Sequence, residues 1–419
     1  MNKNCIKPII VSHSDSKGGA ARAAYRLHRA LRNFKVDSRM MVGSSLQGDW
    51  TIIKPKSKFG RAINIAAGTI DRLPCELQKS SNEVIHSPAW FSSLQARQLN
   101  LALGNVLNLH WICNGLLSIK EISKIEKPVV WTLHDMWAFC GSEHYVNDDE
   151  AARWRHGYSK YNRCVGDRGL DIDYWVYRRK FKHWTSVQHV ICPSRWLASC
   201  VRSSKLMGSW PVHVIPNALD TNTFRPIDRK CARDLLNLPD NLRLVLFGAF
   251  GSTQDRRKGI DLLYETLSVV SKDNNELALV IFGESEPQNE RQYPFPIHWV
   301  GHINDDLMLA ILYSAVDVTV VPSRQENLPQ IATEAIACGC PVVAFDAYGQ
   351  KDTVDHLRTG YLATPYDPID LAQGIRWILS LDNAKYSEMS QRARALALSR
   401  WSQSVVAEQY MEVYQAALG

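Results

Sequence analysis

Glu326 and Glu334 are the residues whose type and spacing most clearly indicate chemistry. Carboxylates accept hydrogen bonds from the paired hydroxyls of a ribose or hexose, and a helix N-terminus offers free amides to a phosphate. The two glutamates lie before and within a helix predicted from Gln330 to Cys338, so together they predict a clamp for a sugar nucleotide. The alternative is that both are solvated side chains flanking a surface helix.

A glycine pair near the N-terminus is a second candidate for phosphate binding. Gly18 and Gly19 directly precede a helix predicted from Ala20 to Leu31. Adjacent glycines let backbone amides approach a diphosphate closely. Their spacing matches neither a dinucleotide fingerprint nor a Walker loop, so a tight turn is the alternative.

Three cations gather before another predicted helix. Arg256, Arg257 and Lys258 precede Gly259 in a polar loop. Cations beside a glycine at a helix start suit a diphosphate leaving group. A solvated charge cluster is the alternative.

Two histidines end predicted strands, and a third lies between two cysteines. His110 and His134 each follow an apolar run, a position that more often holds a packed residue than a catalytic one. Cys140, His144 and Cys164 fall short of the four ligands with paired spacing that zinc sites need. We therefore expect no metal site.

Strands and helices must alternate to position these residues. Apolar, β-branched runs predict buried parallel strands, and helix-forming segments separate them. In open α/β sheets ligands bind at the carboxyl edge, where the candidates above fall. The predicted strands are residues 8–13, 105–110, 128–133, 242–248, 278–282, 297–300, 317–322 and 340–345.

The segment from Glu326 to Glu334 resembles the E-x7-E signature of family 4 of the retaining glycosyltransferases, in its Glu-Asn-Leu-Pro variant. The resemblance implies that Glu326 contacts the transferred sugar and that Glu334 holds the ribose hydroxyls. Asn327 and Leu328 would also contact the donor. Pro329 lacks an N–H, so one backbone donor of many family members is missing here.

Other segments carry the same resemblance. Gly-Gly-Ala-Ala-Arg at 18–22 is similar to the family's N-terminal loop, and Trp131 to Trp137 is similar to the segment whose histidine lines the cleft. Gly18 and Gly19 then become donor-side residues, and His134 would hydrogen-bond to the sugar. Asp135 would orient the ring of His134 or cap the next turn.

The resemblance also assigns a role to the cations. Lys258 would stabilise the departing diphosphate as a catalytic residue, with Arg256 or Arg257 supplying a second charge. Family members usually carry an arginine shortly before this lysine, whereas the stretch 249–253 contains none. Protein cations and helix dipoles would replace a metal, so no cofactor is expected.

The resemblance implies an α/β protein of the GT-B fold, with two Rossmann-like domains whose parallel sheets face an interdomain cleft. We expect an acceptor-side domain over 1–211, with a C-terminal helix of about 400–419 packed back on it. The donor-binding domain would span 212–399. A chain of 419 residues with 45% hydrophobic content agrees with two globular domains.

Charge is distributed unevenly along the chain. Residues 1–210 carry 31 Lys and Arg against 16 Asp and Glu, a balance of +15, and the remainder carries 18 against 26. No nucleic-acid motif accompanies this basic half, which leaves an anionic substrate or membrane as the partner. Lys54 to Arg61 and the apolar residues after it suit an anionic bilayer surface, or else a solvated loop and an ordinary helix.

The N-terminus lacks the apolar core of a signal peptide, and no apolar run is long enough to cross a bilayer. We therefore expect a cytoplasmic enzyme, or one held peripherally on the inner face of the cell membrane. The ten cysteines are then mostly reduced core residues.

The resemblance therefore implies a retaining glycosyltransferase of the hexosyltransferase type. It would move a sugar from a nucleoside diphosphate sugar to a glycan or polyprenyl-linked acceptor, in O-antigen, capsule or exopolysaccharide (lipopolysaccharide-type) synthesis. A sugar-nucleotide epimerase of the same fold would instead release free epimerised sugar without an acceptor. A non-catalytic partner in a polysaccharide-assembly complex would tolerate loss of Glu326 or Lys258.

Overall fold

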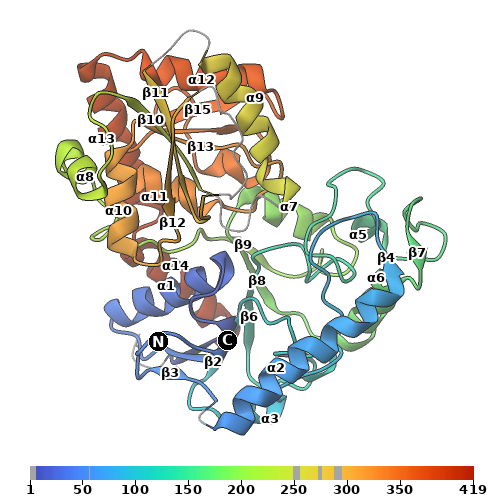
Figure 1. Cartoon of the computed structure of the whole chain (residues 1–419). Coiled ribbons are helices and arrows are strands. Elements are labelled where there is room, and N and C mark those ends of the chain that lie inside the picture. The colour runs from blue at the N-terminus through green and yellow to red at the C-terminus, as the bar shows by residue number, and fades with distance from the viewer. Residues whose placement is uncertain (1–5, 56, 249–254, 272–275, 287–294) are drawn as a thin grey trace. The chain divides into compact units, whose positions relative to one another are not determined.

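The computed structural model describes residues 6–55, 57–248, 255–271, 276–286 and 295–419. Its contacts divide the chain into two compact units (Figure 1). The first unit combines residues up to Ala218 with Val406–Gly419, and the second runs from Leu219 to Val405. The expected domain boundary at 211/212 falls between two paired strands of the first sheet.

The first unit is built on a seven-stranded parallel sheet of order β3-β2-β1-β5-β6-β8-β9. A separate antiparallel pair joins β4 (Gln78–Lys79) to β7 (Arg168–Gly169). The strands of the large sheet are β1 (Pro8–Ser14), β2 (Arg39–Ser44), β3 (Ile52–Ile53), β5 (Val106–Leu109), β6 (Val129–Thr132), β8 (His189–Cys192) and β9 (Val212–Val214).

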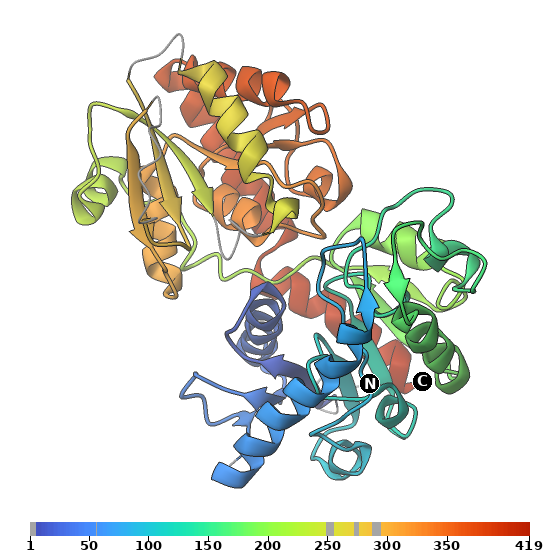
Figure 2. The same ribbon diagram turned by 45° about the vertical axis from the view of Figure 1, so that its right-hand side comes forward.

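Helices cover both faces of this sheet because alternate strand residues point to opposite sides. Ile10 packs with α1 and α14 on one face, whereas Ile9 and Val11 pack into the other. Both helices lie along the same face in Figures 1 and 2. The helices of this unit are α1 (Gly19–Asn33), α2 (Lys58–Arg72), η2 (Leu73–Leu77), α3 (Ala96–Leu101), α4 (Ile119–Ile122), α5 (Arg153–His156), α6 (Ile172–His183), α7 (Arg195–Ser203) and α14 (Gln403–Leu418).

The second unit has a six-stranded parallel sheet of order β12-β11-β10-β13-β14-β15. Its strands are short and largely apolar, as expected when both faces are buried. The strands are β10 (Arg243–Gly248), β11 (Leu277–Phe282), β12 (Ile297–Gly301), β13 (Val318–Val321), β14 (Val342–Phe345) and β15 (Gly360–Ala363).

Two apolar cores lie on the two faces of the second sheet. Leu244 and Leu246 point into one, and Val245 and Phe247 into the other. Figure 1 shows the helices around this sheet. They are α8 (Arg229–Leu236), η3 (Arg256–Lys258), α9 (Ile260–Val270), α10 (Asp306–Ala315), α11 (Gln330–Ala337), η4 (Tyr348–Asp352), α12 (Pro368–Leu379) and α13 (Asn383–Arg400).

Candidate functional site

The loop after β13 presents Glu326 at the carboxyl edge of the second sheet. An ion pair joins Glu326 Oε1 to Lys258 Nζ, so two residues from distant parts of the sequence meet. Ser323 Oγ donates to the same oxygen over 3.4 Å, and the amide of Gly349 donates to the Glu326 carbonyl over 3.1 Å. The Glu326 side chain is 13% exposed and that of Lys258 is 29% exposed, so both remain accessible.

Gly259 explains how Lys258 comes so close to this loop. Its φ is +68°, and a Cβ at this position would lie 2.0 Å from the carbonyl oxygen of Pro322. Only glycine allows both the left-handed backbone and this approach. The loop that carries Lys258 is thereby pressed against the loop that carries Glu326.

Arg324 holds the same two loops together. Its amide donates to the Arg257 carbonyl over 2.6 Å, and its guanidinium forms a bidentate pair with Asp261 of α9 at 2.7 and 2.8 Å. Bidentate arginine–carboxylate pairs fix geometry as well as charge. Sequence reasoning missed Arg324, although its place between Ser323 and Glu326 was the available signal.

The two arginines expected to assist Lys258 differ in their surroundings. Arg257 pairs with Asp255 at 2.6 Å, which neutralises part of its charge. Arg256 is exposed, and its carbonyl accepts from Arg324 over 2.9 Å. The arginine-free stretch 249–253 lies outside the described residues.

Glu334 is more deeply buried than Glu326. It lies in α11 and is only 3% exposed, and its Oε2 accepts a hydrogen bond of 2.7 Å from the Tyr313 hydroxyl of α10. Asn327 and Leu328 are also buried, at 4% and 7% exposed. Tyr313 was not anticipated, because its contact with Glu334 depends on how α10 and α11 pack.

In the first unit, Gly18 and Gly19 lie where β1 passes into α1. Gly18 caps the helix with φ of +86°, and the amide of Arg22 donates to its carbonyl over 3.1 Å. Ser14 Oγ accepts from the amides of Ser16 and Lys17, both at 3.2 Å. The left-handed conformation of Gly18 agrees with a glycine requirement at this turn.

His134 follows β6 and contacts a second histidine. Its Nε2 lies 2.9 Å from Nδ1 of His110, which follows the neighbouring strand β5, and the rings are stacked at 5.1 Å. Burial lowers the pKa of His134 to about 4, so its imidazole is neutral at pH 7. The carboxyl ends of β5 and β6 bring together the two strand-end histidines that the sequence presented separately.

Asp135 caps the next turn, which is one of its two expected roles. Its Oδ1 accepts from the amide of Trp137 over 3.0 Å. Its Oδ2 lies 2.6 Å from His144 Nδ1 and also accepts from Trp111 Nε1 over 3.1 Å. Asp135 therefore orients His144, whereas His134 is oriented by His110.

The ionisation of Asp135 follows from these contacts. Burial alone would raise its pKa, but His144 and the amide of Trp137 outweigh that effect and hold the pKa below its usual value. The other ring nitrogen of His144 lies 2.8 Å from Ser87 Oγ. Both nitrogens of His144 are thus already engaged by protein groups.

The remaining candidate metal ligands do not gather around His144. Cys140 is buried and Cys164 is exposed. Across the described ranges, no group of three or more His, Cys, Asp or Glu side chains is arranged to hold a metal ion.

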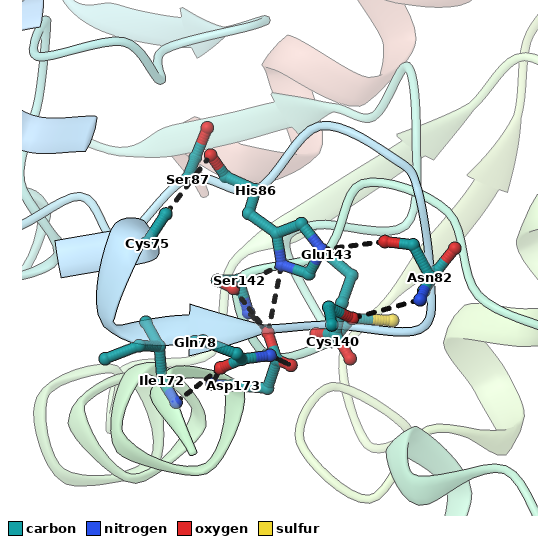
Figure 3. Close-up of polar contacts among 12 residues, drawn as sticks. Cys75, Gln78, Asn82, His86, Ser87, Cys140, Ser142, Glu143, Ile172 and Asp173 are labelled. Carbon is teal, nitrogen blue, oxygen red and sulfur yellow. Dashed lines mark hydrogen bonds and ion pairs between the residues drawn. The ribbon is translucent and has the colours of Figure 1, made fainter. Parts of the chain in front are cut away.

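A buried polar cluster holds the loop that carries His144 (Figure 3). Asp173 of α6 accepts from Gln78 Nε2 over 2.5 Å and from the Ser142 amide over 3.1 Å, and it lies 3.3 Å from His86 Nδ1. Burial would raise the pKa of Asp173, but the contacts with His86, Ser142 and Gln78 hold it below its usual range. Glu143, beside it, has a pKa raised well above its usual value by burial and by the charge of Asp173.

Lys180 supports the same loop from α6. Its ammonium donates to the carbonyls of Trp137, Cys140 and Gly141, with 3.1 and 2.7 Å for the last two, and it lies 3.8 Å from the Trp137 ring centroid. Three donors on one buried nitrogen match three carbonyls. Lys180 of α6 therefore holds the loop after β6 in place through three backbone carbonyls.

Two family models match the chain. The model described as Glycosyltransferase Family 4 matches residues 17–223, and the model described as Glycosyl transferases group 1 matches residues 237–396. The first range holds Gly18, Gly19 and His134, and the second holds Lys258, Glu326 and Glu334.

Curated relatives and solved structures agree with these matches. The chain is 31% identical to a D-inositol 3-phosphate glycosyltransferase of Acidothermus cellulolyticus over 387 residues, which cover 85% of this chain and 76% of that protein. A D-inositol 3-phosphate glycosyltransferase of Xylanimonas cellulosilytica is 31% identical over 49% of this chain and 51% of its own length. The chain spans about half the length of the first curated relatives it matches.

A solved structure of sucrose-phosphate synthase from Thermosynechococcus elongatus superposes with a TM-score of 0.63 at 19% identity, covering 98% of each chain. At this identity the likeness concerns the fold.

Proposed function

This chain belongs to the group 1, family 4 glycosyltransferases and has the GT-B fold predicted from its sequence, and on that premise we propose that it transfers a sugar from a nucleoside diphosphate sugar to an acceptor hydroxyl. The observation that carries the proposal is the ion pair of Lys258 and Glu326 at the carboxyl edge of the second sheet. This edge is where ligands bind in open α/β sheets.

Different residues of the second unit bind different parts of the donor. Lys258, which remains 29% exposed, stabilises the negative charge that develops on the departing diphosphate. Glu326 accepts hydrogen bonds from the transferred sugar, and Glu334 holds the ribose hydroxyls. Asn327 and Leu328 line the donor, and Arg256 adds positive charge. Arg257 contributes less, because Asp255 already pairs with it.

The reaction retains the configuration at C1 of the sugar. The bond between C1 and the diphosphate oxygen breaks, and the acceptor oxygen forms its new bond on the same face through an oxocarbenium-like state. The diphosphate leaves with the bonding electrons, and its oxygen takes the proton from the acceptor hydroxyl. Lys258 lowers the barrier by stabilising that leaving group, and no metal is required.

The first unit supplies further groups. Gly18 and Gly19 lie at the N-terminus of α1, where the positive end of the helix dipole favours a phosphate. His134 forms a hydrogen bond to a hydroxyl of a bound sugar. Its neutral imidazole suits that role better than a charged one.

One acceptor class is a glycan or a lipid-linked sugar, which the enzyme would reach at an anionic membrane surface. In α2 the buried residues are only Ala67, Gly68 and Asp71. Apolar side chains stand exposed along the helix and its continuation, while Lys54, Lys58 and Arg61 carry positive charge nearby. These exposed side chains are Phe59 (75%), Ile63 (41%), Ile65 (73%), Ile70 (41%) and Leu73 (52%).

Helices that lie in a membrane interface typically carry exposed apolar side chains beside cationic ones. In the described part of the chain, no helix combines the length and the apolar character that crossing a bilayer requires. We therefore propose peripheral contact through α2.

Two acceptor classes follow from different observations. The resemblance of the sequence motifs to those of family 4 favours a polyprenyl-linked intermediate of surface-polysaccharide assembly. The relatives named D-inositol 3-phosphate glycosyltransferases favour an inositol phosphate acceptor. Transfer assays with both acceptors separate the two classes.

Nucleotide binding tests the central proposal. We expect UDP, GDP or ADP to raise the melting temperature of the full chain, and the matching labelled sugar donor to label one of the two acceptors. Glu334→Gln, which preserves the bond from Tyr313, should weaken the stabilisation by the nucleotide. If none of the three nucleotides stabilises the protein, the proposed function is wrong.

A further inference from the structure

His134 is the end of a chain of buried hydrogen bonds that begins on the C-terminal helix. His134 Nε2 lies 2.9 Å from His110 Nδ1, and His110 Nε2 lies 3.1 Å from Asn108 Oδ1. The Tyr414 hydroxyl of α14 donates to the same Asn108 oxygen over 2.8 Å. All four residues belong to the first unit, and Asn108, His110 and Tyr414 are 0–3% exposed.

The partners of Asn108 determine which way its side-chain amide is oriented in this series of hydrogen bonds. Its Nδ2 donates to the carbonyl of Val130 over 3.1 Å and to Thr132 Oγ1 over 2.9 Å. A backbone carbonyl can only accept, so the atom that faces Val130 must be the NH₂ group. The oxygen of Asn108 therefore faces His110 and Tyr414.

Proton positions then follow from one ring to the next. Asn108 Oδ1 can only accept, so His110 Nε2 must carry a hydrogen. A neutral imidazole carries one such hydrogen, so His110 Nδ1 is an acceptor. His134 Nε2 must then donate to it, which leaves His134 Nδ1 without a hydrogen.

We propose that Asn108 and His110 are positioning residues that hold His134 as the tautomer protonated on Nε2, with Nδ1 as an acceptor for a hydroxyl of the sugar substrate. The proposal rests on the proposed function for its substrate, and on the hydrogen-bond geometry alone for the tautomer.

The surroundings of both histidine rings favour the neutral state. Burial lowers the pKa of His110 well below its usual value, and the neighbouring His134 lowers it further. Burial lowers the pKa of His134 to about 4, although the charge of Asp135 acts in the opposite direction. Both rings are therefore neutral over the range in which the enzyme would be assayed.

The fixed tautomer has a chemical consequence for the substrate. His134 Nδ1 can accept a hydrogen bond from a sugar hydroxyl but cannot donate one. A ring free to exchange tautomers would spend part of its time with a hydrogen on Nδ1, facing the hydroxyl with the wrong partner. In metal sites, mutating a partner that fixes the tautomer of a ligating histidine lowers metal affinity or activity about 10- to 100-fold. We expect a loss of activity on a comparable scale here.

The tautomer is measurable by nitrogen NMR on the full-length protein labelled with ¹⁵N-histidine. The His134 signals are assigned by their loss in His134→Gln. We expect the wild-type protein at pH 7.5 to show a protonated Nε2 and an unprotonated Nδ1 at His134. A spectrum in which Nδ1 carries the hydrogen overturns the proposal, whatever the variants do.

His110→Phe tests the role of the chain, because it keeps a buried ring and removes both nitrogens. We expect the His134 signals to become those of exchanging tautomers, and kcat for sugar transfer to fall about tenfold. An unchanged His134 pattern, or a wild-type kcat, contradicts the proposal. Melting curves confirm that the variant is folded.

Tyr410→Phe is the matched control. It removes a buried hydroxyl from the same helix. That hydroxyl contacts Thr132 Oγ1 at 3.1 Å, a partner of the Asn108 NH₂ group, but makes no hydrogen bond with Asn108, His110 or His134 themselves. We expect wild-type tautomer and kcat. If the protein transfers no sugar while the His134 spectrum is as expected, the proposed function fails and the tautomer assignment stands.

Discussion

Lys258 and Glu326 form an ion pair between the loop after β10 and the loop after β13, so each neutralises the other while no substrate is bound. A diphosphate that binds to Lys258 must compete with Glu326 for the ammonium. Binding of the donor should therefore exchange one partner of Lys258 for another and release Glu326 toward the sugar.

Replacing each partner of this pair should have different effects. Lys258→Met should lower kcat by about 10²–10³-fold, the scale found on removing one charge-stabilising donor. Glu326→Gln should lower kcat while binding of UDP is kept or strengthened, because Lys258 loses its competitor. Initial rates and nucleotide titrations measure both effects.

Lys351→Met is a suitable control for the pair, since Lys351 is half exposed and lies 3.7 Å from the equally exposed Asp346. Its activity should equal that of the wild type. Equal loss of nucleotide binding in Lys258→Met and Glu326→Gln would contradict the competition between carboxylate and diphosphate.

Gly259 should tolerate no side chain. Gly259→Ala adds a left-handed strain of about 1 kcal/mol and also places a Cβ 2.0 Å from the Pro322 carbonyl. Gly301→Ala shares the positive φ, but no atom lies within 4 Å of its Cβ. We expect Gly259→Ala to lower the free energy of unfolding by roughly 3 kcal/mol or more and to abolish nucleotide binding. Gly301→Ala should lower the free energy of unfolding only by the left-handed strain. Urea unfolding compares them, and equal losses would show that the contact with Pro322 has no energetic effect.

Glu143 should make stability depend on pH. Burial and the charge of Asp173 raise its pKa well above the ordinary value of 4.5. A carboxyl group with a raised folded-state pKa loses stability as the pH rises above its unfolded pKa. Glu143→Gln, which keeps the neutral form, should raise Tm at pH 8 by about 2–4 °C, the shift that 1 kcal/mol produces in domains of this size.

The same substitution should leave Tm near pH 4 unchanged, because Glu143 is protonated there in both states. Melting curves from pH 4 to 8 provide the test, with the exposed Glu150→Gln as control. Parallel pH profiles for Glu143→Gln and the wild type would rule out a buried neutral carboxyl group.

The exposed face of α2 should bind anionic vesicles. The variant with both Phe59→Ser and Ile65→Ser removes two side chains that are 75% and 73% exposed. We expect about a tenfold loss of binding to phosphatidylglycerol vesicles and unchanged stability, because roughly 1.4 kcal/mol corresponds to tenfold in affinity. Sedimentation with vesicles measures the binding.

Leu235→Ser removes an equally exposed leucine, 68% exposed, from the second unit and should bind vesicles like the wild type. Wild-type binding by the α2 variant, or binding that is equal for phosphatidylcholine vesicles, would contradict an anionic interfacial helix.

Much of the architecture could be predicted because buried parallel strands have a strong local signature. The run 317–322 became β13 at Val318–Val321, and the helix expected from Gln330 became α11 at Gln330–Ala337. Placing Glu326 on a loop at the carboxyl edge needed only this local order. The positive φ of Gly18 was also predictable, since a glycine pair before a helix favours it.

Contacts between elements could not be predicted in the same way. The bond between His110 and His134 exists because β5 and β6 are neighbours in the sheet, which no local pattern reveals. The partners of Asp135 and Glu334 depend likewise on how the 136–144 loop folds and on how α10 meets α11. Sequence reasoning placed the candidates at strand ends but not their hydrogen bonds.

The return of α14 to the first unit affects the order in which the chain folds during synthesis. The first unit buries Val406, Ala407, Tyr410 and Tyr414 in its core, and these residues follow the whole second unit in sequence. The ribosome therefore completes the sequence of the second unit before the first unit can finish its core, which reverses the usual order in which N-terminal domains fold first. Until then, the unit that carries His134 has an open apolar groove where α14 will lie, and a chaperone that binds nascent chains would find its target there.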